Sequence, residues 1–224
     1  IKIGYIDKIK ERSKYAEAVA PVLQRGASLS RGDLGARSQI FGTTPDYLKT
    51  TKYGVAEGRF FTKGEDRSGA RVALLGHDVA ENLFPNQDPI GKYFKIDGIR
   101  FKALGVMEKQ GKFLGLFSFD TQVIIPSGTS QRLFSKRGFL RISVKVPEDK
   151  ISESKDGIYG IMRQIRGLKP KEKDDFAVNQ TEAFESTYNQ IKFAIGGVGI
   201  FITVLSLVVG GIGIMNIMFV SVKE

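Results

Sequence analysis

The chain has 224 residues, with 34 lysines and arginines against 24 aspartates and glutamates, one histidine and no cysteine. The lack of cysteine excludes a disulfide framework, a thiolate metal site and a thiol nucleophile, and a single histidine excludes a multi-histidine zinc site. The formal net charge of +10 does not gather in a compact basic cluster with interleaved aromatic residues, so we expect a solvated basic surface and no nucleic-acid partner.

The middle of the chain is rich in predicted strands. Apolar runs and turn residues predict a strand at 71–75, a short helix at 78–84 that Pro85 ends, a hairpin with strands at 93–96 and 99–106, and a strand at 122–125 that Pro126 closes. The dipeptide Asp97-Gly98 favours the two-residue turn of such a hairpin. We therefore expect a β-rich insert at about residues 50–125 within a split domain.

A strand, a helix and a second strand are expected after this insert. Apolar and polar residues alternate over 140–146, which predicts a strand with one wet face. Apolar residues at helical spacing predict a helix over 151–168, and Phe176 with Val178 predict a short returning strand. This alternation of strands and helices indicates that residues 1–190 form an α+β domain.

No pattern in the chain indicates a catalytic or nucleotide-binding site. His77 follows a predicted strand and begins a turn, where a polar residue at a helix start is ordinary, and there is no G-x-S-x-G motif. The segment 105–113 has five residues between its glycines and Phe113 after its lysine, whereas a Walker A loop has four residues and then Ser or Thr. We expect no catalytic residue, cofactor or metal in this chain, and expect any ATP hydrolysis to come from another chain.

Residues 193–222 carry no charged side chain. About 20 apolar residues at a rise of ~1.5 Å cross the hydrocarbon core of a bilayer, so we expect a transmembrane helix here. The alternative is a helix buried in a large soluble core, but soluble helices rarely stay apolar on all faces for so long. Because lysine near the end of a span favours the cytoplasmic side, Lys223 places residues 1 to about 190 outside the cytoplasm. The chain begins at Ile1 without a signal peptide, so we expect it to be part of a longer protein.

Two stripes of residues at spacings of three and four follow the helix that leads into this span. The coupling stripe consists of Phe184, Tyr188, Ile191, Ile195, Val198 and Ile202, and it continues at Leu205, Val209 and Ile212. The glycine seam consists of Gly196, Gly199, Thr203, Ser206, Gly210 and Gly213. Because the coupling stripe begins in the polar segment, it predicts one continuous helix that Asn179 and Glu182 cap and that carries the soluble domain on a rigid stalk. The seam predicts a packed helix–helix interface, with the general abundance of glycine in membrane helices as the alternative.

Four short motifs, taken in order and spacing, resemble a known family. They are GTTPDY at 42–47, EGRFFT at 57–62, ALLG at 73–76 with LFP at 83–85, and DPIG at 88–91. Together they resemble the periplasmic core domain of MacB-type ABC transporter permeases. FAVNQ at 176–180 and GGIGIMNIM at 210–218 resemble the end of that domain and the start of the adjoining FtsX-type membrane region. The chain departs from the family at Ser118-Phe119-Asp120, where we expect paired aspartates, so a conclusion that rests on that acidic pair does not transfer.

The resemblance implies an α+β fold in which a split porter-like α/β subdomain holds an inserted β-rich subdomain, followed by a stalk end and transmembrane helix at 191–222. It also implies a permease of the bacterial inner membrane that works as a homodimer with an ABC ATPase subunit or domain, which binds ATP and magnesium. Such a permease would couple ATP hydrolysis to export of an antibiotic, peptide or lipoprotein by mechanical transmission. Its other partners would be membrane lipid and a periplasmic adaptor protein.

Two other classes of protein share this architecture. A membrane-anchored sensor would continue after Glu224 into a cytoplasmic signalling domain, whereas a permease would continue into more spans. An anchored extracytoplasmic enzyme would need a pocket with perturbed titratable groups. The sequence offers no convincing nucleophile or metal cluster for such an enzyme, and the resemblance favours the permease.

Overall fold

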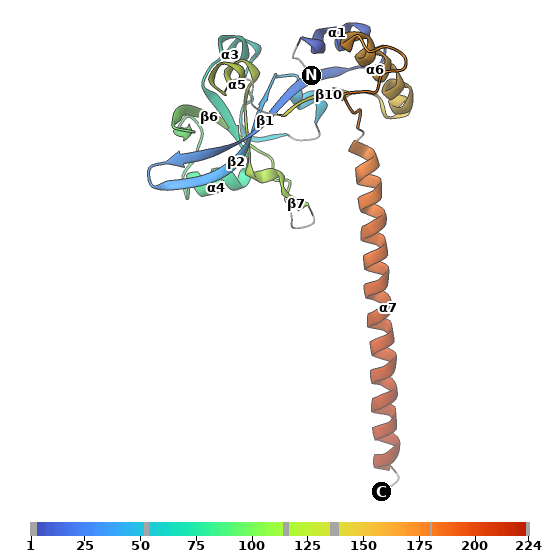
Figure 1. Ribbon diagram of the computed structural model, residues 1–224. Helices are drawn as coiled ribbons and strands as arrows, with labels where there is room; N and C mark the ends of the chain where they lie inside the picture. The colour runs from blue at the N-terminus through green and yellow to red at the C-terminus, as the bar shows by residue number, and fades with distance from the viewer. Residues whose placement is uncertain (1–3, 52–53, 114–116, 135–138, 180, 223–224) are drawn as a thin grey trace. The chain divides into compact units, whose positions relative to one another are not determined.

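The computed structural model describes residues 4–51, 54–113, 117–134, 139–179 and 181–222 (Figure 1). Side chains are described throughout these ranges except at 112–113, 117, 119, 139, 181–192, 216–217 and 219–222. The contacts divide the chain into two units, Ile1–Phe176 and Ala177–Glu224. The domain boundaries that we expect near residues 50, 125 and 190 stay predictions.

The first unit is a mixed α/β domain, and its elements follow in chain order. They are α1 (Tyr5–Arg12), β1 (Ala18–Arg31), β2 (Leu34–Thr43), α2 (Tyr47–Thr50), β3 (Val55–Gly58), α3 (Lys63–Ser68), β4 (Val72–Leu75), α4 (His77–Leu83), β5 (Tyr93–Ile96), β6 (Ile99–Met107), β7 (Lys112–Phe113), β8 (Phe117–Ser118), β9 (Gln122–Pro126), α5 (Ser127–Phe134), β10 (Phe139–Lys145) and α6 (Ile151–Arg166), with short 3-10 helices at Phe119–Thr121 and Glu148–Lys150. The second unit contains α7 (Thr181–Val222).

One eight-stranded sheet joins the strands of the expected β-rich insert to the rest of the first unit. Its strand order is β10-β1-β2-β9-β4-β6-β3, and β5 pairs with both β1 and β6. β2 pairs with β9 and β4 pairs with β6 in parallel, while the remaining pairs are antiparallel. The predicted strands at 71–75, 93–96, 99–106, 122–125 and 140–146 are confirmed as β4, β5, β6, β9 and β10 within a residue or two. The sheet-rich α+β fold predicted from the sequence is therefore confirmed.

The central strands are buried on both faces. In β4, Ala73 and Leu75 pack with α4 and α5 in one apolar cluster, whereas Leu74 points to the other face. There it packs with Ile124 of β9 and Tyr47 of α2. Successive side chains of a strand alternate between faces, so a strand that is covered on both sides needs a continuous apolar run. Each fully buried large aliphatic side chain contributes about 2 kcal/mol, which makes these runs the main source of the stability of this fold.

The hairpin of β5 and β6 has the turn that Asp97-Gly98 predicts. Asp97 has φ 47° and Gly98 has φ 81°, the left-handed conformation that a type I′ turn requires at both positions. The Asp97 carboxylate also accepts a hydrogen bond from the backbone N–H of Ser28 at 2.9 Å and pairs with Arg25 at 2.6 Å. These contacts attach the tip of this hairpin to β1.

The returning strand predicted at Phe176 and Val178 is wrong. Residues 176–179 are not in a strand, and the Phe176 ring packs on Tyr159 of α6 with ring centroids 5.5 Å apart. Asp174 and Asp175 make ion pairs with arginines of α6. The segment after α6 therefore binds back to that helix through side chains rather than to the sheet through its backbone.

Helix α3, which was not predicted from the sequence, begins with a capping box. Thr62 accepts a hydrogen bond from the backbone N–H of Glu65, whose carboxylate accepts one from the backbone N–H of Thr62 at 2.7 Å. Arg59 donates two further hydrogen bonds to that carboxylate at 2.8 and 2.7 Å. The hydrogen bonds from Arg59, and next the backbone of Thr62, lower the pKa of Glu65 from 4.5 to about 2.

We expect Glu65→Gln to reduce the acid sensitivity of the fold. The carboxylate stabilises the folded state at pH values above its unfolded pKa of about 4.5, and this contribution is lost as the pH falls toward the folded pKa of about 2. At neutral pH the variant should have a lower melting temperature than the parent chain. On acidification, its melting temperature should fall by less than that of the parent chain. Thermal melts of the chain in detergent over this pH range measure the difference. Arg59→Gln, which removes the main cause of the shift, should reproduce most of the effect, and a parent-like pH profile in Glu65→Gln would contradict the prediction.

Candidate functional site

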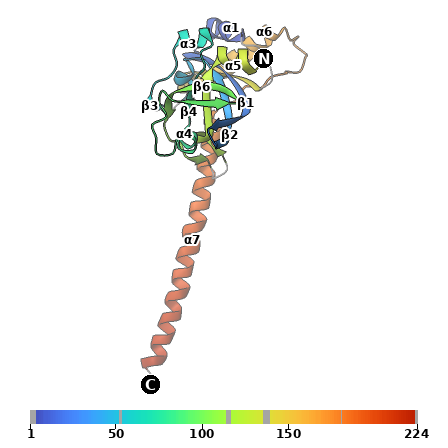
Figure 2. The ribbon, with the colours of Figure 1, turned by 90° about the vertical axis from the view of Figure 1, so that its left-hand side faces the viewer.

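Helix α7 is the element that can place this chain in a membrane. It runs over 42 residues without interruption, which confirms the prediction of one continuous helix (Figures 1 and 2). The segment Phe193–Met215 is long and apolar enough to cross a bilayer, and no part of it is buried within the chain. All backbone hydrogen bonds of a helix are internal, so such a segment is compatible with the hydrocarbon core.

The glycine seam lies along one face of α7 and is open along its length. A Cβ atom added at Gly196, Gly199, Gly210 or Gly213 would meet no atom within 4 Å. The two hydroxyls of the seam are satisfied inside the helix, since Thr203 donates to the Gly199 carbonyl and Ser206 to that of Ile202, both at 2.8 Å. The seam therefore presents a shallow face without an unsatisfied donor, as a close helix–helix contact in lipid requires.

The coupling stripe lies one residue away from the seam around the helix. Its described members, Ile195, Val198, Ile202, Leu205, Val209 and Ile212, are all exposed. The side chains of Phe184, Tyr188 and Ile191 lie outside the described side chains, and so does the cap predicted with Glu182. The partner of either stripe stays a prediction.

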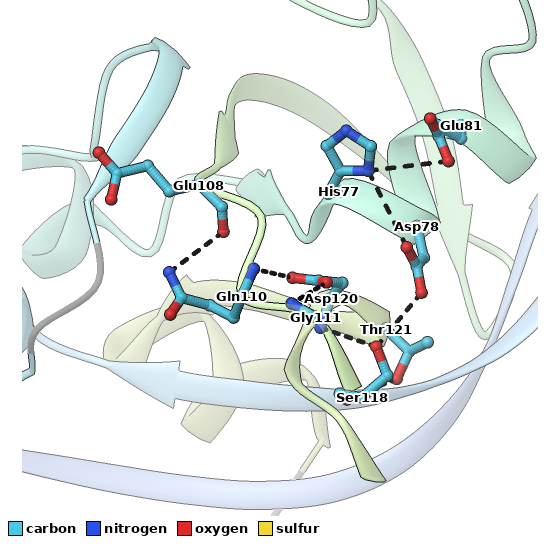
Figure 3. A network of polar contacts seen from close by, with 9 residues as sticks. All are labelled: His77, Asp78, Glu81, Glu108, Gln110, Gly111, Ser118, Asp120 and Thr121. Carbon is cyan, nitrogen blue, oxygen red and sulfur yellow. Dashed lines mark hydrogen bonds and ion pairs between the residues drawn. The ribbon is translucent and has the colours of Figure 1, made fainter. Parts of the chain in front are cut away.

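A second candidate site is a polar network where α4 meets the loops around β7 and β8 (Figure 3). At its centre is Asp120, which is 2% exposed and whose carboxylate accepts hydrogen bonds from the backbone N–H groups of Gln110 at 2.8 Å and Gly111 at 2.7 Å. Ser118 accepts a hydrogen bond from the backbone N–H of Asp120 and donates one to Asp78 of α4. The network joins the end of β6, the β7–β8 hairpin and the first turn of α4.

Asp120 lies in the segment where the sequence departs from the family pattern, and its contacts show what the single aspartate there does. The carboxylate of Asp120, the single aspartate of Ser118-Phe119-Asp120, accepts hydrogen bonds from two backbone N–H groups. The backbone carbonyl of Asp120 lies so close to Gly76 that a Cβ atom at Gly76 would overlap it. In the part of the chain that the structure describes, this segment therefore has a structural role. It holds the loop that follows β6 against α4.

The segment 105–113 does not form a phosphate-binding loop. Gly105 lies within β6, and a Cβ there would meet the carbonyl of Glu57 on the neighbouring strand. Gly111 has φ 80° and turns the chain toward β7, with its N–H bound to Asp120. A Walker A loop needs free backbone N–H groups that converge on a phosphate, and this N–H is already occupied.

His77 is the first residue of α4, the helix-start position predicted for it. Its Nδ1 atom lies 3.9 Å from Asp78 Oδ1 and 3.7 Å from Glu81 Oε2, and the three residues form the cluster that could hold a metal ion among the described residues. This cluster was not predicted from the sequence. The spacing His-Asp-x-x-Glu at a predicted helix start was the available signal, since residues one helical turn apart share a face.

We expect Asp120→Ala to destabilise the first unit strongly. The substitution removes a buried carboxylate and leaves the part-buried N–H groups of Gln110 and Gly111 without their acceptor, which costs about 1–3 kcal/mol for each group that stays unsatisfied. Asp88→Ala is the matched control, because the Asp88 carboxylate also accepts from a backbone N–H, that of Ile90, but in an exposed position. Urea unfolding should show a loss of several kcal/mol for Asp120→Ala and under about 1 kcal/mol for Asp88→Ala. Equal losses would contradict the role assigned to Asp120.

Comparison with known proteins finds one family and a consistent set of relatives. The family described as MacB-like periplasmic core domain matches residues 2–156. A macrolide export ATP-binding/permease protein MacB of Rhodospirillum rubrum is 35% identical over 215 residues, which cover 92% of this chain and 32% of the relative. A pyoverdine export ATP-binding/permease protein PvdT of Pseudomonas fluorescens is 32% identical, covering 92% of this chain and 31% of the relative. The chain thus spans about a third of the length of these curated relatives.

Two solved structures share the fold. The periplasmic region of MacB from Actinobacillus actinomycetemcomitans matches 84% of this chain and 83% of its own length, with a TM-score of 0.69 and 18% identity. The extracellular domain of the noncanonic ABC-type transporter YknZ, from Gram-positive bacteria, matches 75% of this chain and 86% of its own length, with a TM-score of 0.65 and 19% identity. Since the family match covers well over half of the chain and agrees with the fold, this protein belongs to the MacB-like periplasmic core domain family.

Proposed function

We propose that the chain is the extracytoplasmic domain and the adjoining transmembrane helix of an ABC transporter permease in the bacterial inner membrane. It would couple ATP hydrolysis in the cytoplasm to export of a substrate such as an antibiotic, a peptide or a lipoprotein. The observation that carries the proposal is the unbroken course of α7 from Thr181 through the candidate span at Phe193–Met215, in a chain of this family. A helix that continues from the domain side into a bilayer can transmit force in both directions.

The sequence at the expected membrane boundary supports a rigid connection. Residues 181–195 contain neither glycine nor proline, the residues that most readily interrupt or bend a helix. The first glycine of α7 is Gly196, inside the span. A movement of the span would therefore rotate or displace the whole of α7, including its first turn at Thr181.

The ATPase would belong to another domain or subunit. The closest approach to a nucleotide-binding loop in this sequence, residues 105–113, is part of a strand and a turn, and the relatives are named as ATP-binding/permease proteins about three times as long as this chain. We propose that such a domain binds ATP and magnesium, and that this chain contributes no residue to the nucleotide site. A second permease copy, membrane lipid and a periplasmic adaptor would complete the assembly.

A flexible insertion at the membrane boundary tests the rod. In the full-length transporter, seven flexible residues (Gly-Gly-Ser-Gly-Gly-Ser-Gly) inserted after Lys192 should abolish export while ATP hydrolysis continues. The matched control is an insertion of seven alanine-rich helical residues, which is about two helical turns and nearly preserves the rotation of the span relative to the domain. The helical insertion should retain export. Export that survives the flexible insertion would overturn the rod mechanism, and loss of export with both insertions would assign the defect to length rather than to flexibility.

Leucine substitutions in the glycine seam test whether it packs against a second helix. Gly199→Leu with Gly210→Leu places two large side chains on a face where the backbone is now open, so it should weaken dimerisation of the full-length permease and lower export. Gly197→Leu with Gly211→Leu is the control, since both glycines lie in the same helix one residue away from the seam and are equally open. Disulfide crosslinking is a clean measurement because this chain has no cysteine of its own. Equal crosslinking in both double variants would contradict a packed seam.

A further inference from the structure

The cluster of His77, Asp78 and Glu81 lies beside a hollow of about 510 Å³ that no part of the proposed transport mechanism uses. The hollow is lined by residues of β3, α4 and the loop after α4, among them His77, Glu81 and Glu57. His77 and Asp78 begin α4, and Glu81 follows one helical turn later, which brings the three polar groups together (Figure 3).

The Nδ1 atom of His77 is buried and has no hydrogen-bond partner within the described residues. Its distances of 3.9 Å to Asp78 Oδ1 and 3.7 Å to Glu81 Oε2 are too long for hydrogen bonds. An unsatisfied buried nitrogen that faces two carboxylate oxygens calls for a group between them. Two ligand atoms that each lie about 2.1 Å from a tetrahedral metal ion are about 3.4 Å apart, so a small movement of side chains would give that separation.

A second set of contacts orients the Asp78 carboxylate. Its Oδ2 atom accepts a hydrogen bond from the Ser118 hydroxyl at 3.2 Å, and Ser118 Oγ itself accepts from the backbone N–H of Asp120 at 3.1 Å. The buried Asp120 holds this loop in place, as described above. The arrangement leaves Oδ1 directed at His77, and it has the form of the outer-shell hydrogen bonds that orient metal ligands in proteins.

The carboxylates beside His77 bind no other described cation. The described residues that line the hollow include Glu57 and Glu81 but no lysine or arginine. Arg31 and Lys92 reach the hollow only at the side-chain oxygen of Gln87, another lining residue, and neither pairs with Asp78 or Glu81. Within the described residues, His77 is the sole ion-pair partner of Asp78 and Glu81, and it is neutral when it acts as a metal ligand.

We propose that His77, Asp78 and Glu81 bind a divalent transition-metal ion of the zinc class. One imidazole nitrogen and two carboxylate oxygens suit zinc and its neighbours better than magnesium or calcium, which prefer oxygen ligands alone. Three protein ligands would leave a fourth position for water or for an anionic group of a small ligand. Bound metal would join the first turn of α4 to the Ser118 loop through Asp78.

Titration of the chain with zinc chloride in detergent micelles, followed by calorimetry, tests the site. We expect one zinc ion for each chain and at least tenfold weaker binding in His77→Ala and in Glu81→Gln, because even outer-shell partners of a metal are worth 10- to 100-fold in affinity. Glu81 is the safer substitution, since its side chain is 66% exposed and its loss does not disturb packing. Glu57→Gln is the matched control, because it removes one negative charge from the same hollow without removing a proposed ligand, and it should change the affinity by less than about twofold.

The single histidine gives a second readout that general electrostatic attraction would not move. In a sample labelled with 15N-histidine, zinc should shift the Nδ1 resonance of His77, and magnesium should not. The proposal is overturned if Glu57→Gln weakens binding as much as Glu81→Gln, if zinc binds without a change at Nδ1, if magnesium binds as tightly, or if no zinc binds.

Discussion

The burial of β4, β9 and residues 103–107 of β6 on both faces is the constraint on which the first unit depends. These strands pair side by side in the order β9-β4-β6, so their apolar side chains contribute to both apolar clusters, one on each face of the sheet. The other strands are added outward from them: β2 pairs with β9, and β3 and β5 pair with β6. β1 then pairs with β2, and β10 pairs with β1. A polar residue in the middle of β4 or β9, or within residues 103–107 of β6, would lie in one core or the other. This explains why these segments are apolar runs, whereas residues 99–102 of β6 alternate and expose Arg100 and Lys102.

The same constraint determines where polar groups can lie. The loops that leave these buried strands have backbone N–H groups that the sheet does not pair, and the buried carboxylate of Asp120 accepts two of them. The Gly76 position at the end of β4 is narrow enough that only glycine fits beside the Asp120 carbonyl. The first turn of α4 is therefore held at a fixed distance from the Ser118 loop. The His77 cluster is built on that rigid junction, and a metal ligand set is accurate only on such rigid support.

Local signals predicted much of this fold, and long-range contacts explain what was missed. The β5–β6 hairpin could be predicted because Asp97-Gly98 favours one turn conformation whatever surrounds it. The β1–β2 hairpin was overlooked despite Gly32-Asp33 at its turn, since the small and polar residues of its strands hide the alternation. The strand at Phe176 was wrong because two alternating apolar residues are too few, and Phe176 finds its partner in Tyr159 instead. The buried role of Asp120 could not be predicted, because its two donors lie nine and ten residues away across a loop.

The second unit follows a different physical rule. In α7, large apolar side chains such as Phe193 and Leu207 are about 80% and 76% exposed, and burial against the chain itself does not cover them. Lipid can cover large side chains as well as protein can, so lipid alone gives no reason for glycines to align at intervals of three and four residues. Packing against another helix would explain the alignment, because a face of small residues lets two helix backbones approach closely enough for van der Waals contact. The hydroxyls of Thr203 and Ser206 fit this account, since each is already bonded to its own helix and needs no polar partner across the contact. In the proposed mechanism the seam and the unbroken stalk would have linked roles. A close helix contact would move the span, and a helix without glycine or proline between Thr181 and Gly196 would carry that movement out of the membrane.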